Sequence, residues 1–323
     1  MLPRFKSLRD LERAFPTEQA CIDYLEATIW KGKTPISPHD PNSEVYKCAD
    51  QKTSSKKHPV AKYSRYKCKN TGNYFTIKSL TIFRNSKIPL RDWFTALYLF
   101  SSHTKRISSY QLAKHIGITQ KTAWFSLHRL REASNCPIFK TILKGFVEVD
   151  ETLIGGSNPN RHWDKKVPNC QGRSGKDKIP VWGGRERGGN LICWAVPDAK
   201  RKTLEPIIRE NIKQGSNVYT DEWLAYNDLG KWYNHQIVIH KIKQYVNGEV
   251  TTNRIENAWS HLKRNIFGTY HWVSKKHLQR YLDEFTFHFN ARDYSIQERF
   301  DLILASSFGK RLTYRELIGQ RFL

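Results

Sequence analysis

The chain has 323 residues, of which 54 are Lys or Arg and 30 are Asp or Glu, so its net charge is +24 and its isoelectric point is near 9.8. No apolar run is long enough to span a bilayer, and the N-terminal stretch lacks the apolar core of a signal peptide, so we expect a cytoplasmic protein without a membrane partner. A positive surplus this large favours a polyanion, usually nucleic acid. The alternatives are charge kept for solubility or an acidic membrane surface, and the spread of charge along the chain disfavours the membrane.

The first part of the chain is predicted to be helical and then to enter a small strand-containing module. Residues 1–30 repeat Leu and aromatic side chains at helical spacing, with a break near Pro16. Residues 31–75 are rich in proline and polar runs and lead into the strand-like RYKCKNTGNYFTIKS at 65–79. The six cysteines are scattered and form no C-x-x-C pair, so we expect free thiols that serve packing.

A helix-glycine-helix pattern is the clearest local motif. Residues 89–103 read as an amphipathic helix that Pro89 begins, and residues 107–131 then contain two short helices separated at Gly117, with Thr119 as the expected N-cap of the second. Each helix has one apolar face, made by Leu112, Ala113 and Ile116 in the first and by Ala123, Leu127 and Leu130 in the second. Three side chains of the second helix are expected to be exposed: Gln120, Lys121 and Arg129. The pattern is typical of a helix-turn-helix, and the charge favours DNA binding over an ordinary helical hairpin.

From residue 145 onward, strands are interleaved with helices. In GFVEVDETLIGG (145–156) the alternation places Val147 and Val149 on one face of a strand and Glu148 and Asp150 on the other. The next segments are predicted to be a hairpin at 179–196, a helix at 202–215, strands at 216–221 and 235–241, and helices at 253–265 and 274–292. This order predicts an α/β domain.

Three acids of this α/β region occupy positions where metal chemistry would need them. Asp150 falls at the end of one strand, Asp221 ends another, and Glu256 lies in the first turn of a helix. Carboxylates are the ligands that Mg²⁺ or Mn²⁺ prefers, and two such ions can activate a nucleophile and stabilise the leaving oxygen of a phosphodiester. Each acid also has an ordinary explanation: Asp221 as an N-cap, Glu256 in a capping box with Asn253 as N-cap, and Asp150 as a solvated edge residue. Together, in so basic a chain, they favour a metal site.

Four blocks of the α/β region carry a family resemblance: VEVDETLIGG, VWGGRERGG, VYTDEWLAY and NRIENAWSHLKRNIFGTYHWVSKKHLQRYLDEFTFHFNAR. They resemble the catalytic domain of bacterial DDE insertion-sequence transposases of the ISXO type. FPTEQACIDYLEATIW and the blocks up to residue 132 match the same family in order, so the resemblance covers nearly the whole chain. It implies a ribonuclease H-like mixed sheet flanked by helices, preceded by a ribbon-like module and a helix-turn-helix domain. The expected divisions are 1–88 for the N-terminal helix and ribbon, 89–140 for the helix-turn-helix region, 141–300 for the catalytic domain and 301–323 for a C-terminal tail.

The resemblance also implies a mechanism. The family's three acids fall on Asp150, Asp221 and Glu256, which would bind two Mg²⁺ or Mn²⁺ for cleavage at the element's ends and joining of the 3′-hydroxyl to target DNA. A family lysine about two helical turns after the third acid falls on Lys263. The expected partners are the terminal inverted repeats, target DNA and further copies of the chain during synapsis. The side chains expected to contact DNA are Gln120, Lys121, Arg129 and Arg264.

The chain departs from the family at its N-terminal ribbon, where two C-x-x-C pairs usually bind zinc. TPISPHDP stands in place of one pair, and Cys68 keeps only Thr71 where its mate would be. Cys48 and Cys68 cannot supply four thiolates, and no spacing supports a mixed site with His39 and His58. We therefore predict a ribbon-like module that folds without zinc.

In some family members Asn takes the place of the third acid, and Asn257 is adjacent to Glu256. At about 100° per residue, one helical stripe is apolar and must face the sheet: Ile255, Trp259, Leu262 and Ile266. Glu256 and Lys263 flank this stripe, whereas Asn257 and Arg264 project to the far side, toward solvent or DNA. Helix geometry therefore favours Glu256.

Two other functions remain open from the sequence. A structure-specific ribonuclease H-like nuclease would cleave DNA without joining it, and a catalytically silent regulator derived from a transposase would only bind DNA. The presence of all three acids argues against the silent form.

Overall fold

The computed structural model describes residues 3–48, 65–156, 158–168, 170, 177–239 and 248–319. The chain divides into two compact units, the first made by residues 1–136 and 294–323 and the second by residues 137–293. Among the described residues, no helix combines the length and the apolar character that a membrane crossing requires. All six cysteines are free, as predicted.

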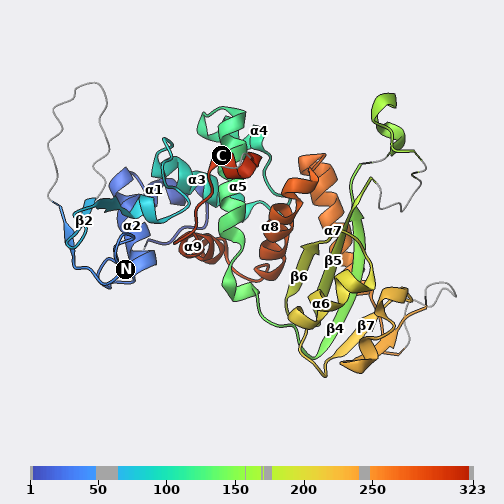
Figure 1. The fold of residues 1–323 in the computed structure, drawn as a ribbon. Helices are drawn as coiled ribbons and strands as arrows, with labels where there is room; N and C mark the ends of the chain where they lie inside the picture. The colour runs from blue at the N-terminus through green and yellow to red at the C-terminus, as the bar shows by residue number, and fades with distance from the viewer. Residues whose placement is uncertain are drawn as a thin grey trace. The chain divides into compact units, whose positions relative to one another are not determined.

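The first unit is built on helices around an aromatic core. These helices are α1 (Leu8–Ala14), α2 (Glu18–Trp30), α3 (Leu90–Ser102), α4 (Ser109–Ile116), α5 (Gln120–Ser134), α9 (Ile296–Ser306) and α10 (Tyr314–Ile318) (Figure 1). The break expected near Pro16 is confirmed, because Thr17 caps α2 by accepting the N–H of Ala20. The expected domain end at residue 300 falls inside α9. Phe300 of that helix packs edge-to-face against Phe5 and Phe94, so the last segment belongs to this core and is not a separate tail.

A three-stranded antiparallel sheet lies where the ribbon-like module was expected, formed by β1 (Val45–Lys47), β2 (Arg65–Cys68) and β3 (Tyr74–Thr76). Cys68 pairs with Val45, whereas Cys48 donates its N–H to the carbonyl of Arg65 at the other end of β2. Three residues of strand, about 10 Å, therefore separate the two cysteines.

The thiol of Cys68 is surrounded by hydroxyl groups. Burial alone would raise its pKa, but hydrogen bonds from Ser37, Ser43 and Thr71 outweigh burial and lower the pKa to about 6. Hydroxyls thus occupy the surroundings in which the family places further thiolates. His58 lies outside the described residues, and folding without zinc stays a prediction.

The second unit is a mixed α/β domain, as predicted. Its sheet has the strand order β6-β5-β4-β7-β8. The strands are β4 (Phe146–Ile154), β5 (Ile179–Glu186), β6 (Leu191–Ala195), β7 (Asn217–Thr220) and β8 (Asn234–Ile237) (Figure 1). β4, β5 and β6 are antiparallel neighbours, whereas β7 and β8 run parallel to β4. The expected hairpin joins β5 to β6, with Gly188 at a positive φ of 74° that glycine adopts without strain.

Helices cover both faces of this sheet. On one face, α6 (Arg201–Asn211) packs against β4 through a cluster that includes Val147, Val149, Leu204 and Ile208. On the other face lie α7 (Asn253–Asn265) and α8 (Leu278–Asn290), whose cluster with β5 and β6 includes Val181, Leu191, Ile255, Trp259, Leu262, Ile266 and Leu282. The predicted apolar stripe of α7 is confirmed, and the alternation of β4 directs Glu148 and Asp150 toward α7.

Candidate active site

Asp150 lies on β4, and Asp221 directly follows β7, the parallel neighbour of β4. β4 continues to Ile154, so Asp150 is inside the strand and not at its end as expected. The parallel pairing matches Glu148 with Tyr219, and continuing that register brings Asp150 alongside Asp221, which follows β7 directly. Adjacent strands are about 4.8 Å apart, so the fold places the two aspartates on the same face as neighbours.

Asp150 interacts electrostatically with both other acids. The residue is half-buried, and Trp259 Nε1 donates to its Oδ2 at 3.0 Å. Burial of Asp150, followed by the negative charges of Asp221 and Glu256, raises the pKa of Asp150 to about 7. The structure therefore brings together the three acids that the sequence singled out. Trp259, interpreted from sequence as a core residue, is buried and also orients Asp150.

Hydrogen bonds from the chain orient Asp221 and Glu256. Asp221 Oδ1 accepts the N–H of Trp223 at 3.0 Å, so its role as a turn cap and its place in the acidic site coexist. Glu256 Oε1 accepts from the hydroxyl of Thr252 at 2.9 Å. Asn257, the competing residue, is exposed, whereas Glu256 is half-buried.

The capping box expected at the start of α7 is wrong. The N-cap is Thr252, not Asn253, and the hydroxyl of Thr252 makes no capping hydrogen bond to the helix backbone. The carboxylate of Glu148, from the distant strand β4, accepts the N–H groups of Arg254 and Ile255 instead. A partner so far away in sequence leaves no local signal.

Oxygen-only donors of this kind suit a hard divalent cation. Across the described ranges, no group of three or more His, Cys, Asp or Glu side chains is spaced to hold a metal ion. The acids nevertheless interact electrostatically, since the pKa of Asp150 is raised by the other two after burial. A bound cation would relieve this repulsion, and carboxylate oxygens are the donors that Mg²⁺ and Mn²⁺ take.

The remaining predicted site residues lie on helix surfaces, with one exception. Lys263 and Arg264 are exposed on α7, and Lys121 is exposed near the start of α5. Gln120 is half-buried and donates to Ser109 Oγ at 2.8 Å. The turn between α4 and α5 is as predicted: Gly117 has a φ of 67°, and Thr119 accepts the N–H of Thr122 at 3.3 Å.

Arg129 is the exception, and its expected exposure is wrong. Only 7% of its surface is exposed, and its Nε donates to the carbonyl of Leu312 at 3.2 Å. Burial lowers the pKa of its guanidinium to about 10. The segment that leads into α10 covers this part of α5, which helical periodicity within α5 could not reveal.

Comparison with known proteins shows the family of the chain. Residues 142–290 match the model of the ISXO2-like transposase domain. An uncharacterized transposase-like protein of Haemophilus influenzae is 35% identical over 101 residues, which cover 29% of this chain and 76% of that protein. The chain belongs to the ISXO2-like transposase family. This family membership makes it a nucleic-acid-cleaving enzyme of the DDE class, a class that generally uses divalent metal ions.

Two further likenesses have lower sequence identity. An uncharacterized protein in transposable element ISH50 of Halobacterium salinarum is 29% identical to this transposase over 232 residues, covering 69% of this chain and 77% of that protein. The crystal structure of the Mos1 strand transfer complex matches 68% of this chain and 79% of its own with 14% identity and a TM-score of 0.26, which is too low to support an argument.

Two acids beside Asp150 have separate environments in the transposase. Glu151 points to the α6 face, where it accepts from the hydroxyl of Tyr226, and burial raises its pKa to about 8. Glu148 shares the face of Asp150 but is engaged by α7 and by Arg187. The alternation of β4 gave the face of Glu148, but sequence reasoning missed its partners.

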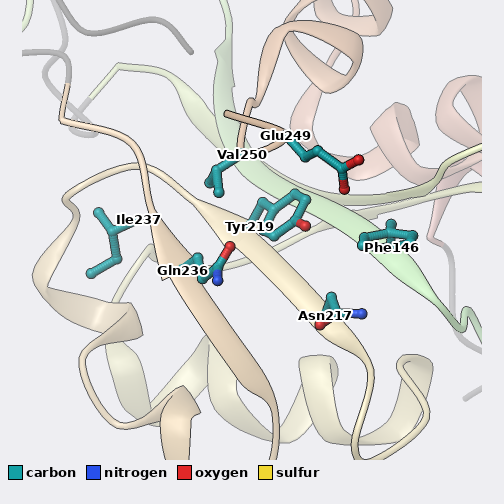
Figure 2. Close-up of a pocket in the computed structure, with 7 residues that line it drawn as sticks. All are labelled: Phe146, Asn217, Tyr219, Gln236, Ile237, Glu249 and Val250. Atoms are coloured by element: carbon teal, nitrogen blue, oxygen red, sulfur yellow. The ribbon is translucent and has the colours of Figure 1, made fainter. Parts of the chain in front are cut away.

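A groove lies over β7 and β8, on the face of the sheet that carries Glu148 and Asp150. It is lined by Phe146, Asn217, Tyr219, Gln236, Ile237, Glu249 and Val250, and Figure 2 shows the ring of Tyr219 between Phe146 and Gln236. Tyr219 precedes Asp221 on β7 and pairs with Glu148, so the groove adjoins the strands that carry the acids.

Proposed function

We propose that the transposase cleaves DNA at the ends of an insertion sequence and joins the freed 3′-hydroxyl to target DNA at a site formed by Asp150, Asp221 and Glu256. The observation that carries this proposal is the convergence of three carboxylates from β4, the end of β7 and α7, expressed in the raised pKa of Asp150. We also infer that the second unit is a ribonuclease H-like domain. Three antiparallel strands followed by two parallel strands, with helices on both faces, support that inference.

The chain's own residues would orient the site. Trp259 holds Asp150, the N–H of Trp223 holds Asp221, and Thr252 holds Glu256, so the chain holds each carboxylate by a hydrogen bond. Such bonds behind the ligands fix their direction. Two divalent cations bound by these acids would lower the pKa of the attacking water or 3′-hydroxyl and stabilise the leaving oxygen.

DNA would meet the transposase on two surfaces. Lys263, exposed on the helix that carries Glu256, is placed to contact a phosphate near the scissile bond, with Arg264 beside it. Gln120 and Lys121 at the start of α5 would contact the terminal repeats, mainly through phosphates. Bringing two ends together would require more than one copy of the chain.

A strand-transfer assay tests the proposal. Wild-type protein is incubated with labelled DNA carrying the element's ends, with a target plasmid, and with Mg²⁺, Mn²⁺ or a chelator. We expect joined products only when a divalent cation is present, and none with Asp150→Asn. Cleavage without joining would favour a nuclease, and DNA binding without cleavage would favour a silent regulator.

A pair of substitutions on α5 should separate the DNA surface from the interior. Lys121→Ala is expected to weaken DNA binding at all sequences and to reduce its dependence on salt by about one unit of slope, because one phosphate contact is lost. Arg129→Ala is expected to destabilise the protein by about 1–3 kcal/mol, because a buried carbonyl loses its charged donor.

Fluorescence anisotropy with end DNA at several salt concentrations, together with urea denaturation, measures both effects. If Arg129→Ala left stability unchanged and weakened DNA binding more than Lys121→Ala, the buried position of Arg129 would be contradicted.

A further inference from the structure

We infer that Glu148 is a positioning residue of the proposed active site, because its carboxylate fastens the first turn of α7 to β4 and thereby fixes where Glu256 points. This inference rests on the proposed function, in which Glu256 is a metal ligand. Glu148 itself touches no substrate in this proposal. Its place on β4, two positions before Asp150 and on the same face, allows one strand to set both acids.

The burial and contacts of Glu148 are those of a structural anchor. The residue is completely buried, and its Oε2 accepts the N–H of Arg254 at 2.9 Å and that of Ile255 at 3.1 Å. A carboxylate is the favoured partner for a helix N-terminus, because the N–H groups there carry partial positive charge. Charge-assisted bonds of this kind are roughly twice as strong as neutral ones.

The start of α7 depends on this carboxylate. A helix leaves its first four N–H groups without partners in the helix. In α7 the N–H of Asn253 donates to Thr251 Oγ1 at 3.1 Å, and that of Glu256 donates to the carbonyl of Thr252 at 3.1 Å. The two N–H groups between them both donate to Glu148, so removing its side chain would leave the middle of the first turn without acceptors.

Arg187 holds Glu148 from the other side. Its Nε lies 3.1 Å from Glu148 Oε1, and its Nη2 donates to the carbonyl of Glu249 at 2.7 Å. The guanidinium carbon lies 4.8 Å from the ring centroid of Tyr219 and 5.8 Å from that of Phe146. Figure 2 shows these two rings on the side of the groove where Glu249 lies. Arg187 is thus fixed from several directions, and Glu148 is a charge-balanced part of the interior.

The position of Glu256 follows from this anchor. Glu256 comes directly after Ile255, whose N–H Glu148 binds, and each residue of a helix turns by about 100°. A first turn that frays or rotates would therefore swing the Glu256 carboxylate away from Asp150. The hydrogen bond from Thr252 orients the carboxylate of Glu256. The position of Thr252 itself depends on the first turn of α7, which follows it.

Three variants of the full-length protein test the inference: Glu148→Ala, Glu148→Gln and the control Asn290→Ala. Asn290 is also buried in the second unit and makes two hydrogen bonds, from its amide to the Leu191 carbonyl and from the Leu191 N–H to its oxygen, so these bonds go to β6 and not to α7. Hydrogen exchange of the peptide that spans Arg254 and Ile255 is measured by mass spectrometry. Mn²⁺ binding is measured by calorimetry at a temperature where every variant is folded.

For Glu148→Ala we expect faster exchange at the start of α7 and a dissociation constant for Mn²⁺ that rises by about 10–100-fold, the usual effect of removing a group behind a metal ligand. Glu148→Gln keeps an acceptor oxygen and should recover part of both properties. Asn290→Ala should leave both near wild type. Unchanged exchange in Glu148→Ala, or an affinity equal to that of Asn290→Ala, would overturn the inference. If wild type neither bound Mn²⁺ nor joined DNA, the proposed function would fail, and the exchange data would still decide whether Glu148 anchors α7.

Discussion

Replacing Glu256 by glutamine is expected to slow DNA cleavage by more than about 100-fold, because groups that only support a metal ligand already contribute about 10–100-fold and Glu256 is proposed as a ligand itself. Glutamine removes the negative charge that attracts the cation but keeps an oxygen that can accept the hydroxyl of Thr252. The side chain is half-buried, and glutamine has nearly the same shape. Stability and end binding should therefore stay close to wild type, which single-turnover cleavage, thermal denaturation and anisotropy would show.

Asn257→Ala is the matched control for this prediction, because it changes the next residue of the same helix. Asn257 is exposed on the side of α7 that faces away from the sheet. Its truncation should leave cleavage within about twofold of wild type, since exposed substitutions away from special features have small effects. Loss of cleavage in Asn257→Ala, with Glu256→Gln active, would reverse the assignment of the third acidic position.

Periodicity was sufficient to predict which side of α7 packs against the sheet. The apolar stripe of Ile255, Trp259, Leu262 and Ile266 is buried against β5 and β6, so helical spacing correctly oriented Glu256 relative to the sheet. The alternation of β4 likewise assigned Glu148 and Asp150 to the face of α7. Both predictions worked because burial imposes a fixed repeat on each kind of element.

Contacts between distant segments could not be predicted in this way. Asn253 looked like the N-cap of α7 because local rules favour it, but the acceptor comes from Glu148, more than one hundred residues earlier. Arg129 looked exposed because a basic residue on a short helix usually is, yet the Leu312 carbonyl covers it. In both cases a partner outside the local window decided the outcome, and one sequence carries no signal for it.

Gly183→Ala should be the most damaging change within the sheet. Gly183 pairs with Asp150 across β4 and β5. A Cβ at this position would lie 2.3 Å from Trp259 Cη2 and 2.7 Å from Cζ2, far inside contact distance. Trp259 is buried and its Nε1 binds Asp150, so it cannot move aside without disturbing the site. We expect a loss of about 1–3 kcal/mol of stability from overpacking, together with reduced cleavage by the protein that remains folded.

Gly184→Ala separates packing from catalysis, because the next residue of β5 faces the opposite side of the sheet. Its Cβ would meet Leu143 Cδ1 at 2.9 Å, the end of a side chain that can adjust, and Trp182 at 3.2 Å. This variant should also lose stability but should keep the cleavage rate per folded molecule, because Leu143 and Trp182 belong to the cluster on the α6 face, opposite Asp150. Urea denaturation and single-turnover cleavage below the unfolding transition measure the two effects. Equal cleavage rates in the two variants would mean that Trp259 does not orient Asp150, whereas a loss confined to Gly183→Ala would place the close approach of β5 and Trp259 within the catalytic apparatus.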